Sequence, residues 1–201
     1  PEYLIFQADV LSRLKQKPHA ARALASLEKE ATTHQLETSW LFLLSDVYYR
    51  LEKFDDALRT LDLLGRRKPE DSRIDLYRGQ VHLVKGDLDL ARDSLNKSID
   101  KSANNPLAYY ELGRILQLRD ELSAAKKALL EAVRQDGNNP EYLHRLGSIC
   151  LDLNEPEEAI KYLKRAEPSA ATLPEIYYAL GNAHQRRGDP ARAREYREKY
   201  Q

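Results

Sequence analysis

The chain has 201 residues, of which 32 are basic and 32 are acidic, so its formal net charge at pH 7 is zero. This balance gives no electrostatic reason to expect nucleic acid or an anionic membrane surface as the main partner, and no apolar run approaches the roughly 18 residues that a membrane-spanning helix needs. The single cysteine, Cys150, excludes an internal disulfide.

One pattern recurs along the chain every 34 residues. The repeating units, in chain order, span 4–37, 38–71, 72–105, 106–139, 140–173 and 174–201, and the last of these is shorter than the others. A fixed period of this length is typical of solenoid proteins, in which each repeat packs only on its neighbours. We therefore expect residues 1–201 to form a single elongated array of repeats.

The unit 106–139 shows most clearly that each repeat contains two helices. Its first helix places small or apolar residues at i, i+3, i+4 and i+7, which is one helical face: Tyr109, Leu112, Gly113 and Leu116. Asn105 can cap this helix and Pro106 can take its first position, where a missing N–H has no cost. The same pair of residues recurs as Asn139-Pro140.

A turn is predicted between the two helices of each unit. Gly86, Asp120, Asn154 and Gly188 occupy the same repeat position, and these residue types tolerate a left-handed backbone that ends a helix. The second helix then carries an alanine series, Ala57, Ala91, Ala125, Ala159 and Ala193, with Ala23 in the first unit. Small residues at Gly113 and Ala125 predict a close crossing of the two helices.

The two terminal units depart from this pattern. In the first unit Leu11 stands where a small residue is expected, and a local shift that uses Ala8 instead, with a longer turn near Lys17-Pro18, is an alternative. In the last unit Arg197 and Tyr200 replace residues that are apolar in the other repeats. This substitution suits an exposed terminal helix or a helix that a further capping helix would follow.

These positions resemble the tetratricopeptide repeat (TPR): an aromatic residue or Leu, then Leu-Gly, an aromatic residue, Ala, an apolar residue, Ala and a closing Pro. The resemblance covers essentially the whole chain and is best in units three to five. It implies an all-α fold, a right-handed α–α superhelix of about six helix-turn-helix units. It also implies a concave groove that holds a peptide or a helix of a partner.

The predicted groove face is apolar where an ordinary surface helix would be polar. At 100° per residue, repeat positions two, five, nine and twelve of each first helix lie opposite the core face. Aromatic and Leu residues mixed with Arg at these positions have the composition of interface anchors. The partner-binding residues that we predict are Phe42, Asp46, Tyr49, Arg73, Leu76, Gln80, Tyr110, Arg114, His144, Tyr178 and Asn182. Packing against the adjacent repeat is the alternative interpretation of the same residues.

Arg73 and Arg114 suggest that the bound segment carries an acidic group. A subset of the family clamps the C-terminal carboxylate of heat-shock chaperones and needs Lys at position five. That position has no Lys in any unit, which argues against a chaperone-tail adaptor; it holds Ala8, Phe42, Leu76, Tyr110, His144 and Tyr178.

No catalytic, metal or cofactor site is predicted. His82, Cys150 and His184 fall at a core position of three different units, so we expect them to be structural. Asp55-Asp56 and Glu157-Glu158 begin second helices, where the helix dipole favours acidic residues. No glycine-rich phosphate loop, nucleophile elbow or zinc-like spacing occurs.

The sequence therefore predicts a soluble, non-catalytic scaffold that binds a protein or peptide partner, within a larger protein or assembly. We expect no small-molecule substrate. The alternatives are a regulatory or substrate-recruiting TPR domain of a larger enzyme and, less favoured by the neutral charge, an RNA-binding helical repeat. Self-association through the terminal helices is a further possibility. With no signal peptide at Pro1-Glu2-Tyr3-Leu4, the compartment stays open between cytoplasm and periplasm.

Overall fold

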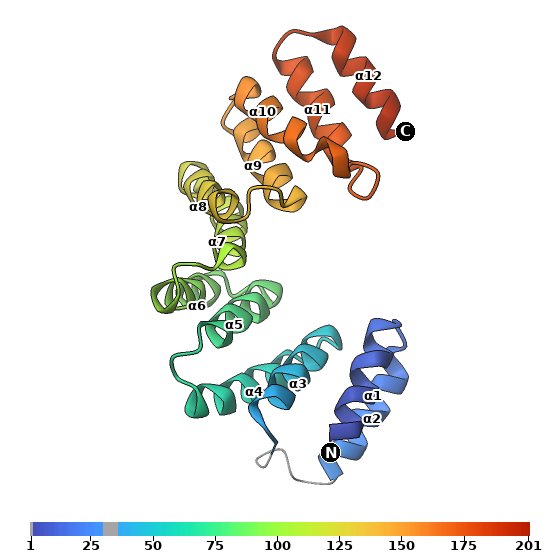
Figure 1. Ribbon diagram of the computed structural model, residues 1–201, viewed down its shortest axis with the longest axis vertical. Coiled ribbons are helices and arrows are strands. Elements are labelled where there is room, and N and C mark those ends of the chain that lie inside the picture. Colours follow the sequence, from blue (N-terminus) through green and yellow to red (C-terminus); the bar gives the residue numbers. More distant parts are fainter. Residues whose placement is uncertain (1, 30–35) are drawn as a thin grey trace. The chain divides into compact units, whose positions relative to one another are not determined.

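A computed structural model describes residues 2–29 and 36–201 of the chain. Within these ranges the only regular secondary structure is helical, and the helices follow one another as antiparallel pairs joined by short turns (Figure 1). The predicted all-α class is confirmed. None of the helices in the described ranges combines the length and the apolar character that crossing a bilayer requires.

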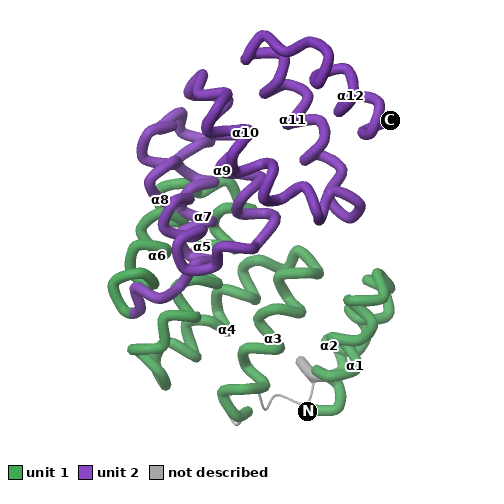
Figure 2. Tube along the Cα trace, turned by 45° about the horizontal axis from the view of Figure 1, so that its top comes forward, with its two compact units in different colours: residues 1–101 green, residues 102–201 purple. Residues whose placement is uncertain are grey.

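The chain divides into two compact units, residues 1–101 and residues 102–201 (Figure 2). The helices of the first unit are α1 (Glu2–Arg13), α2 (Lys17–Lys29), α3 (Thr38–Arg50), α4 (Phe54–Arg67), α5 (Ser72–Lys85) and α6 (Leu88–Lys101). Those of the second are α7 (Pro106–Leu118), α8 (Leu122–Gln135), α9 (Pro140–Asp152), α10 (Pro156–Ala166), the short 3₁₀ helix η2 (Glu167–Ser169), α11 (Glu175–Arg186) and α12 (Pro190–Tyr200). The single array over 1–201 stays a prediction.

The helix starts follow the capping chemistry of the sequence. The side chain of Asn105 accepts a hydrogen bond from the backbone N–H of Ala108 (3.2 Å), and Pro106 is the first residue of α7. Asn139 accepts in the same way from the N–H of Glu141 (3.1 Å) at the start of α9. These side chains satisfy backbone donors that have no partner inside the helix, as the Asn-Pro pairs predicted.

The turn between paired helices has a left-handed residue at one fixed repeat position. Gly86, Asp120, Asn154 and Gly188 have φ of 84°, 61°, 59° and 82°, as the sequence predicted, and Glu52 and Lys15 also have positive φ. Lys15 fits this series only if the first repeat begins three residues earlier than the 34-residue frame.

The first helix pair is indeed displaced by three residues. Ala8, and not Leu11, is the fully buried small residue of α1, and Ala20 of α2 is fully buried at the position of Ala57. The connection between α1 and α2 has the same length as that between α3 and α4, so the predicted longer turn near Lys17-Pro18 is wrong. The extra residues lie between α2 and α3, where residues 30–35 fall outside the described ranges.

The paired helices cross closely at glycine. A Cβ added to Gly113 would lie 2.7 Å from Leu129 Cγ, and one added to Gly147 would lie 2.5 Å from Leu163 Cγ. Both leucines are fully buried. The close crossing that Gly113 and Ala125 predicted is therefore confirmed.

Each unit has its own apolar core. In the first unit the core includes Leu41, Leu44, Val47, Leu61 and Leu64 of α3 and α4. In the second it includes Leu129, Leu143, Leu146, Ile149 and Leu163 of α8, α9 and α10. The first-unit core also includes Ile5 of α1 and Ile74 of α5, and in the second unit α8 and α9 belong to successive pairs. Within each unit, neighbouring repeats therefore share a core, as solenoid packing requires.

Candidate functional site

A cavity opens between α3 and α5 of the first unit, with a volume of about 220 Å³. Three of the residues that line it, Asp46, Tyr49 and Gln80, belong to the predicted partner-binding set. The complete lining is Ser45, Asp46, Tyr49, Leu61, Tyr77, Gln80 and Val81. The cavity is thus aromatic and aliphatic on most sides, with a carboxylate and an amide that can orient a bound group.

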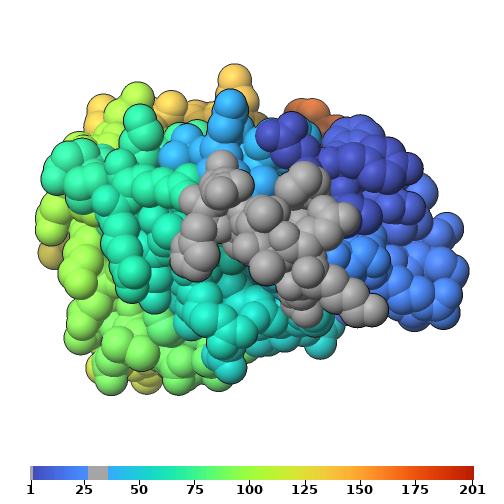
Figure 3. Space-filling model, turned by 90° about the horizontal axis from the view of Figure 1, so that it is seen from below, coloured from blue at the N-terminus to red at the C-terminus, as the bar shows by residue number. Residues whose placement is uncertain are grey.

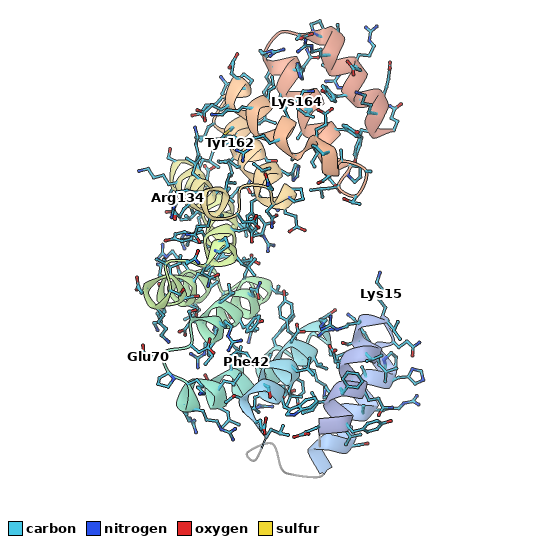
Figure 4. The ribbon with its side chains drawn as sticks, viewed as in Figure 1. Lys15, Phe42, Glu70, Arg134, Tyr162 and Lys164 are labelled. Atoms are coloured by element: carbon cyan, nitrogen blue, oxygen red, sulfur yellow. The ribbon has the colours of Figure 1, made fainter. Side chains whose placement is uncertain are left out.

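Phe42, Tyr77 and Arg73 pack together beside this cavity. The Phe42 ring, labelled in Figure 4, lies edge-on to the Tyr77 ring at a centroid distance of 5.9 Å, and this contact joins α3 to α5. The Arg73 guanidinium lies over the Phe42 ring, with its Cζ 4.4 Å from the ring centroid. This arrangement gives the cavity an aromatic border with one cation on it.

Arg73 already has an anionic partner. Its Nη2 donates to Asp71 Oδ2 (2.6 Å) and its Nε donates to Asp71 Oδ1 (2.9 Å). These hydrogen bonds hold the pKa of the Asp71 carboxyl below its usual range. An acidic group of a partner would therefore have to compete with Asp71 for Arg73.

Asp46 belongs to an ionic network that joins α1 to α3. Arg50 donates to Asp46, to Asp9 Oδ1 (2.6 Å) and to Ser12 Oγ (3.0 Å). Burial opposes the ionisation of Asp9, but hydrogen bonds from Arg50 and Arg13 outweigh it, so the pKa of Asp9 lies below its usual value. Asp46 is consequently held in place by Arg50 at the edge of the cavity.

Leu76 was predicted to be an exposed anchor for a partner, but its side chain is buried. Only 6% of it is exposed, so its side chain is part of the protein interior and cannot serve a partner without rearrangement. The sequence placed Leu76 opposite the core face, but an apolar side chain at that position gains more by packing inward.

The predicted residues of the second unit lie on α7, α9 and α11. The Tyr110 ring packs on the Tyr142 ring at 4.9 Å, and Arg114 donates to Glu111 Oε2 (2.7 Å), whose carboxylate is buried. Tyr110 and Arg114 are therefore partly engaged within the chain.

His144, Tyr178 and Asn182 differ in how accessible they are. His144 is half-buried, and burial lowers the pKa of its imidazole, with Arg145 adding to the effect. Asn182 is also half-buried, whereas Tyr178 is 53% exposed and lies 5.5 Å from the Tyr200 ring. Of the predicted anchors in this unit, Tyr178 offers the largest free apolar surface.

Four residues of the cavity were missed by sequence reasoning: Ser45, Leu61, Tyr77 and Val81. Tyr77 and Val81 occupy repeat positions six and ten. These positions face the first helix of the preceding repeat, α3, whereas the prediction used positions two, five, nine and twelve. The signal that could have found Tyr77 is its spacing of 35 residues from Phe42, one residue more than the period, which places the two rings on facing sides of neighbouring helices.

A cluster in the second unit has the composition of a metal site. Ligand atoms of Cys150, Glu155 and Glu158 lie within 4.8 Å of one another. However, the Lys126 ammonium lies among them, 2.7 Å from Glu158 Oε2 and hydrogen-bonded to Glu155, so a cation already balances the carboxylates. Burial raises the pKa of the Cys150 thiol to about 11, which disfavours the thiolate that a metal would need. The cluster is an ion-pair site at the surface, beside the buried Cys150.

Sequence and structure comparisons agree on one family. Profiles described as tetratricopeptide repeat match residues 42–106, 83–149, 140–167 and 174–195. No curated protein sequence matches the chain.

Several solved protein structures are similar in fold to this chain. The crystal structure of MamA has a TM-score of 0.71 at 23% identity and covers 81% of this chain and 89% of that chain. YrrB, described as a TPR protein with an unusual peptide-binding site, has a TM-score of 0.68 at 17% identity, and the match covers 87% of this chain and 89% of that chain. Pseudomonas aeruginosa pilF has a TM-score of 0.73 at 18% identity, and the match covers 81% of this chain and 74% of that chain. At these identities the likeness concerns the fold.

Proposed function

Because this chain belongs to the tetratricopeptide repeat family, we propose that it is a non-catalytic scaffold that binds a segment of a partner protein. The binding surface is formed by first helices of the repeats, and its centre is the cavity between α3 and α5. The partner segment is extended or helical, and it belongs to a larger assembly in which this chain takes part.

The cavity is the observation that supports this proposal. Its volume of about 220 Å³ suits one large apolar side chain of a partner, since Tyr49, Tyr77, Leu61 and Val81 surround it. Desolvated pockets of this composition are where interface anchors bind. The peptide-binding site of YrrB, a protein of the same fold, supports a peptide as the ligand class.

The cavity also changes what we expect the partner to carry. Arg73 and Arg114 each have a carboxylate partner in the chain, Asp71 and Glu111. An acidic group on the partner would therefore bind these two arginines less strongly than it would bind two arginines without carboxylate partners. We propose that an apolar side chain inserted between α3 and α5 dominates the affinity.

A peptide selection tests this function. A random peptide library displayed on phage is selected against the immobilised chain, and enriched peptides are titrated by calorimetry. The Gln80→Trp variant fills the cavity with an indole, while Gln185→Trp places the same side chain on the exposed surface of α11. We expect binding to the wild type and to Gln185→Trp, and at least about tenfold weaker binding to Gln80→Trp, which corresponds to about 1.4 kcal/mol. Failure to enrich any peptide, or equal affinity for all three proteins, would contradict the proposal.

A further inference from the structure

A second cavity of the first unit opens between α4 and α6, and its most buried lining residues, Ile74 and Asp75, belong to α5. Its volume is about 540 Å³, which is within the roughly 300–1,000 Å³ that ligand pockets occupy. Figure 3 shows residues of α4, in turquoise, and of α6, in green, at the molecular surface. The cavity has no lining residue in common with the α3–α5 cavity and is therefore a separate place on the chain.

The sequence departs from the repeat pattern at three positions, and all three residues line this cavity. Asp75 and Arg78 occupy repeat positions four and seven, which hold leucine in the second and fifth repeats: Leu41, Leu44, Leu143 and Leu146. Gly65 occupies the position of Ile99 and Val133 in the two following repeats. A Cβ added to Gly65 would lie 2.9 Å from Arg78 Nη2, so the glycine makes room for the guanidinium. Positions at which a chain breaks its own pattern are expected to serve function.

The Asp75 carboxylate already has two cationic partners. Only 4% of its side chain is exposed, and it accepts a hydrogen bond from Arg78 Nη1 (3.0 Å) and another from the Lys101 ammonium. Arg78 donates in addition to Asp62 Oδ1 (2.8 Å). The two carboxylates of the cavity are thus paired by Arg78 and Lys101, and no further cation is needed to balance them.

Arg66 of α4 and Lys97 of α6 are the two cations that this network leaves over. Both side chains are exposed and line the cavity, and in the part of the chain that the structure describes neither has an ion-pair or hydrogen-bond partner. Lys97 lies one helical turn before Lys101, where two like charges repel each other. The charged lining therefore has an excess of two positive charges, because four cations stand against two carboxylates: Arg66, Arg78, Lys97 and Lys101 against Asp62 and Asp75.

Stability alone does not explain this polar arrangement. Apolar residues of similar volume in place of a buried ion pair often leave a protein equally stable or more stable, and the second and fifth repeats have such residues at positions four and seven. Arg66 and Lys97 contribute no ion pair to the network, and their charges repel those of Arg78 and Lys101. An anion bound among these four cations would relieve that repulsion.

We propose that this cavity binds the phosphate group of a phosphate ester, and that Arg66 and Lys97 recognise it. A phosphate monoester carries about −1.5 to −2 charges at pH 7, which matches the excess positive charge of the lining, whereas a carboxylate carries only one charge. The guanidinium of Arg66 can donate two parallel hydrogen bonds to phosphate oxygens, and the ammonium of Lys97 adds a compact charge. This site is independent of partner binding between α3 and α5.

The size of the cavity favours an ester over inorganic phosphate. A volume of about 540 Å³ is many times the roughly 30 Å³ that one water molecule occupies in the liquid, so the organic part of the ester has room beside Ile74 and Pro69. A small phosphorylated molecule and a phosphorylated side chain of another protein present the same group, so a measurement with both separates the two sources.

Calorimetry at physiological salt, which screens long-range attraction, tests the site with glycerol 3-phosphate and with a short phosphoserine peptide. We expect saturable binding of at least one of these probes to the wild type, and at least about tenfold weaker binding to the double variant Arg66→Gln, Lys97→Gln. The matched control Lys127→Gln, Arg194→Gln removes the same two charges from exposed side chains of α8 and α12 and should bind as the wild type does. The probe that binds more tightly identifies the source of the phosphate.

Refilling the cavity is the second test. The variant Asp75→Leu, Arg78→Leu restores the leucines of the second and fifth repeats, and we expect it to remain folded by circular dichroism and to lose both phosphorylated probes. Retained binding in the folded variant would overturn the proposal; if this variant does not fold, the substitutions at the exposed Arg66 and Lys97 decide. Equal affinity of the two glutamine double variants would also overturn it, as would no saturable binding to the wild type or equally tight binding of the same peptide with glutamate in place of phosphoserine.

Discussion

The first and last helix pairs of the chain contain the same fold element but expose opposite chemistry. The outer face of α1 is apolar, with Tyr3 and Phe6 exposed, whereas α12 exposes Arg194, Arg197 and Glu198. Apolar side chains gain free energy when a partner covers them, whereas charged side chains are best left in water. Among the described residues, the first pair therefore offers a surface suited to burial and the last pair one suited to water.

The first and last pairs are held by different interactions. Arg50 of α3 joins α1 to the next repeat through Asp9 and Ser12, which is an ionic attachment. Within the last pair, α12 packs on α11 through Tyr196, whose ring stacks on His184 at a centroid distance of 5.4 Å and lies 6.2 Å from the Tyr177 ring. One end should therefore respond to loss of a charge, and the other to protonation of a buried imidazole.

The largest expected change in stability comes from a glycine-to-alanine substitution in an interior helix pair, which we compare with the same substitution in the last pair. In Gly147→Ala the new Cβ would lie 2.5 Å from Leu163 Cγ, and Leu163 is fully buried. We expect the free energy of unfolding to fall by about 3 kcal/mol, because a packed interior cannot absorb the extra methyl group. In Gly181→Ala the nearest atom is Arg197 Cγ at 3.3 Å, on an exposed side chain, so the change should stay within about 0.5 kcal/mol.

Guanidinium unfolding followed by circular dichroism measures both variants. Because repeat arrays can unfold in stages, the comparison uses the transition midpoints along with the fitted free energies. If Gly181→Ala lost as much stability as Gly147→Ala, the last pair would be as tightly packed as the interior ones, and the difference between them would disappear.

The next effect tests the ionic attachment of α1. In Arg50→Met the Asp9 carboxylate loses its hydrogen bond from α3 while remaining buried, and we expect a loss of about 2 kcal/mol. The control is Arg59→Met, which removes an exposed pair with Asp56 and should cost less than about 0.5 kcal/mol.

The pH dependence of the Arg50→Met variant gives a second readout. Because the pKa of Asp9 is held below its usual value of 3.8, its contribution to wild-type stability is present above pH 3.8 and is lost as the pH falls below that value. The difference between Arg50→Met and the wild type should therefore shrink at low pH. An unchanged difference would show that the network does not hold α1.

The fold was largely predictable because its signals are periodic and local. The 34-residue spacing located the helix pairs from α3 onward, and Asp120 and Asn154 identified the left-handed turns. The displacement of the first repeat was left open between Leu11 and Ala8, because the residues that cause it lie between α2 and α3, where no repeat signature marks the offset.

The candidate site was less predictable, because periodicity fixes the side of a helix and not the partner of a side chain. Of the residues that it named, Asp46, Tyr49 and Gln80 line one cavity, and their role in partner binding stays a prediction. It did not show that Leu76 packs inward or that Arg73 binds Asp71, since both depend on side-chain conformation. The Arg114–Glu111 pair could have been anticipated, because residues three apart on a helix are neighbours.

A smaller effect is expected at the other end, where His184 contacts α12. Burial lowers the pKa of this imidazole below its usual value of 6.5, and Arg187 adds to the shift. The unfolded chain therefore binds a proton more readily than the folded chain does, so the free energy of unfolding should fall as the pH drops below about 6.5. In His184→Phe, which keeps a ring against Tyr196, this pH dependence should decrease.

Chemical unfolding at pH 7.5 and at pH 5 measures the difference for the wild type, His184→Phe and the exposed-histidine control His19→Gln. The control should behave as the wild type does. If His184→Phe lost as much stability on acidification as the wild type, the pH dependence would belong to another group, and His144 would be the first to substitute because burial also lowers its pKa.

The smallest expected change in stability comes from Lys15→Gly in the turn of the first pair, and it is a gain instead of a loss. Lys15 has φ of 58°, a left-handed backbone that costs a residue with a Cβ about 1–2 kcal/mol, and its side chain points away from the helices (Figure 4). Gly86 and Gly188 occupy the same repeat position. Lys15→Gly removes the backbone penalty but adds freedom to the unfolded chain, so the net gain should be about 0.5 kcal/mol. The same substitution at Lys53, which has negative φ, should instead destabilise the protein, and a gain at both sites would show that the left-handed turn of the first pair is not the cause.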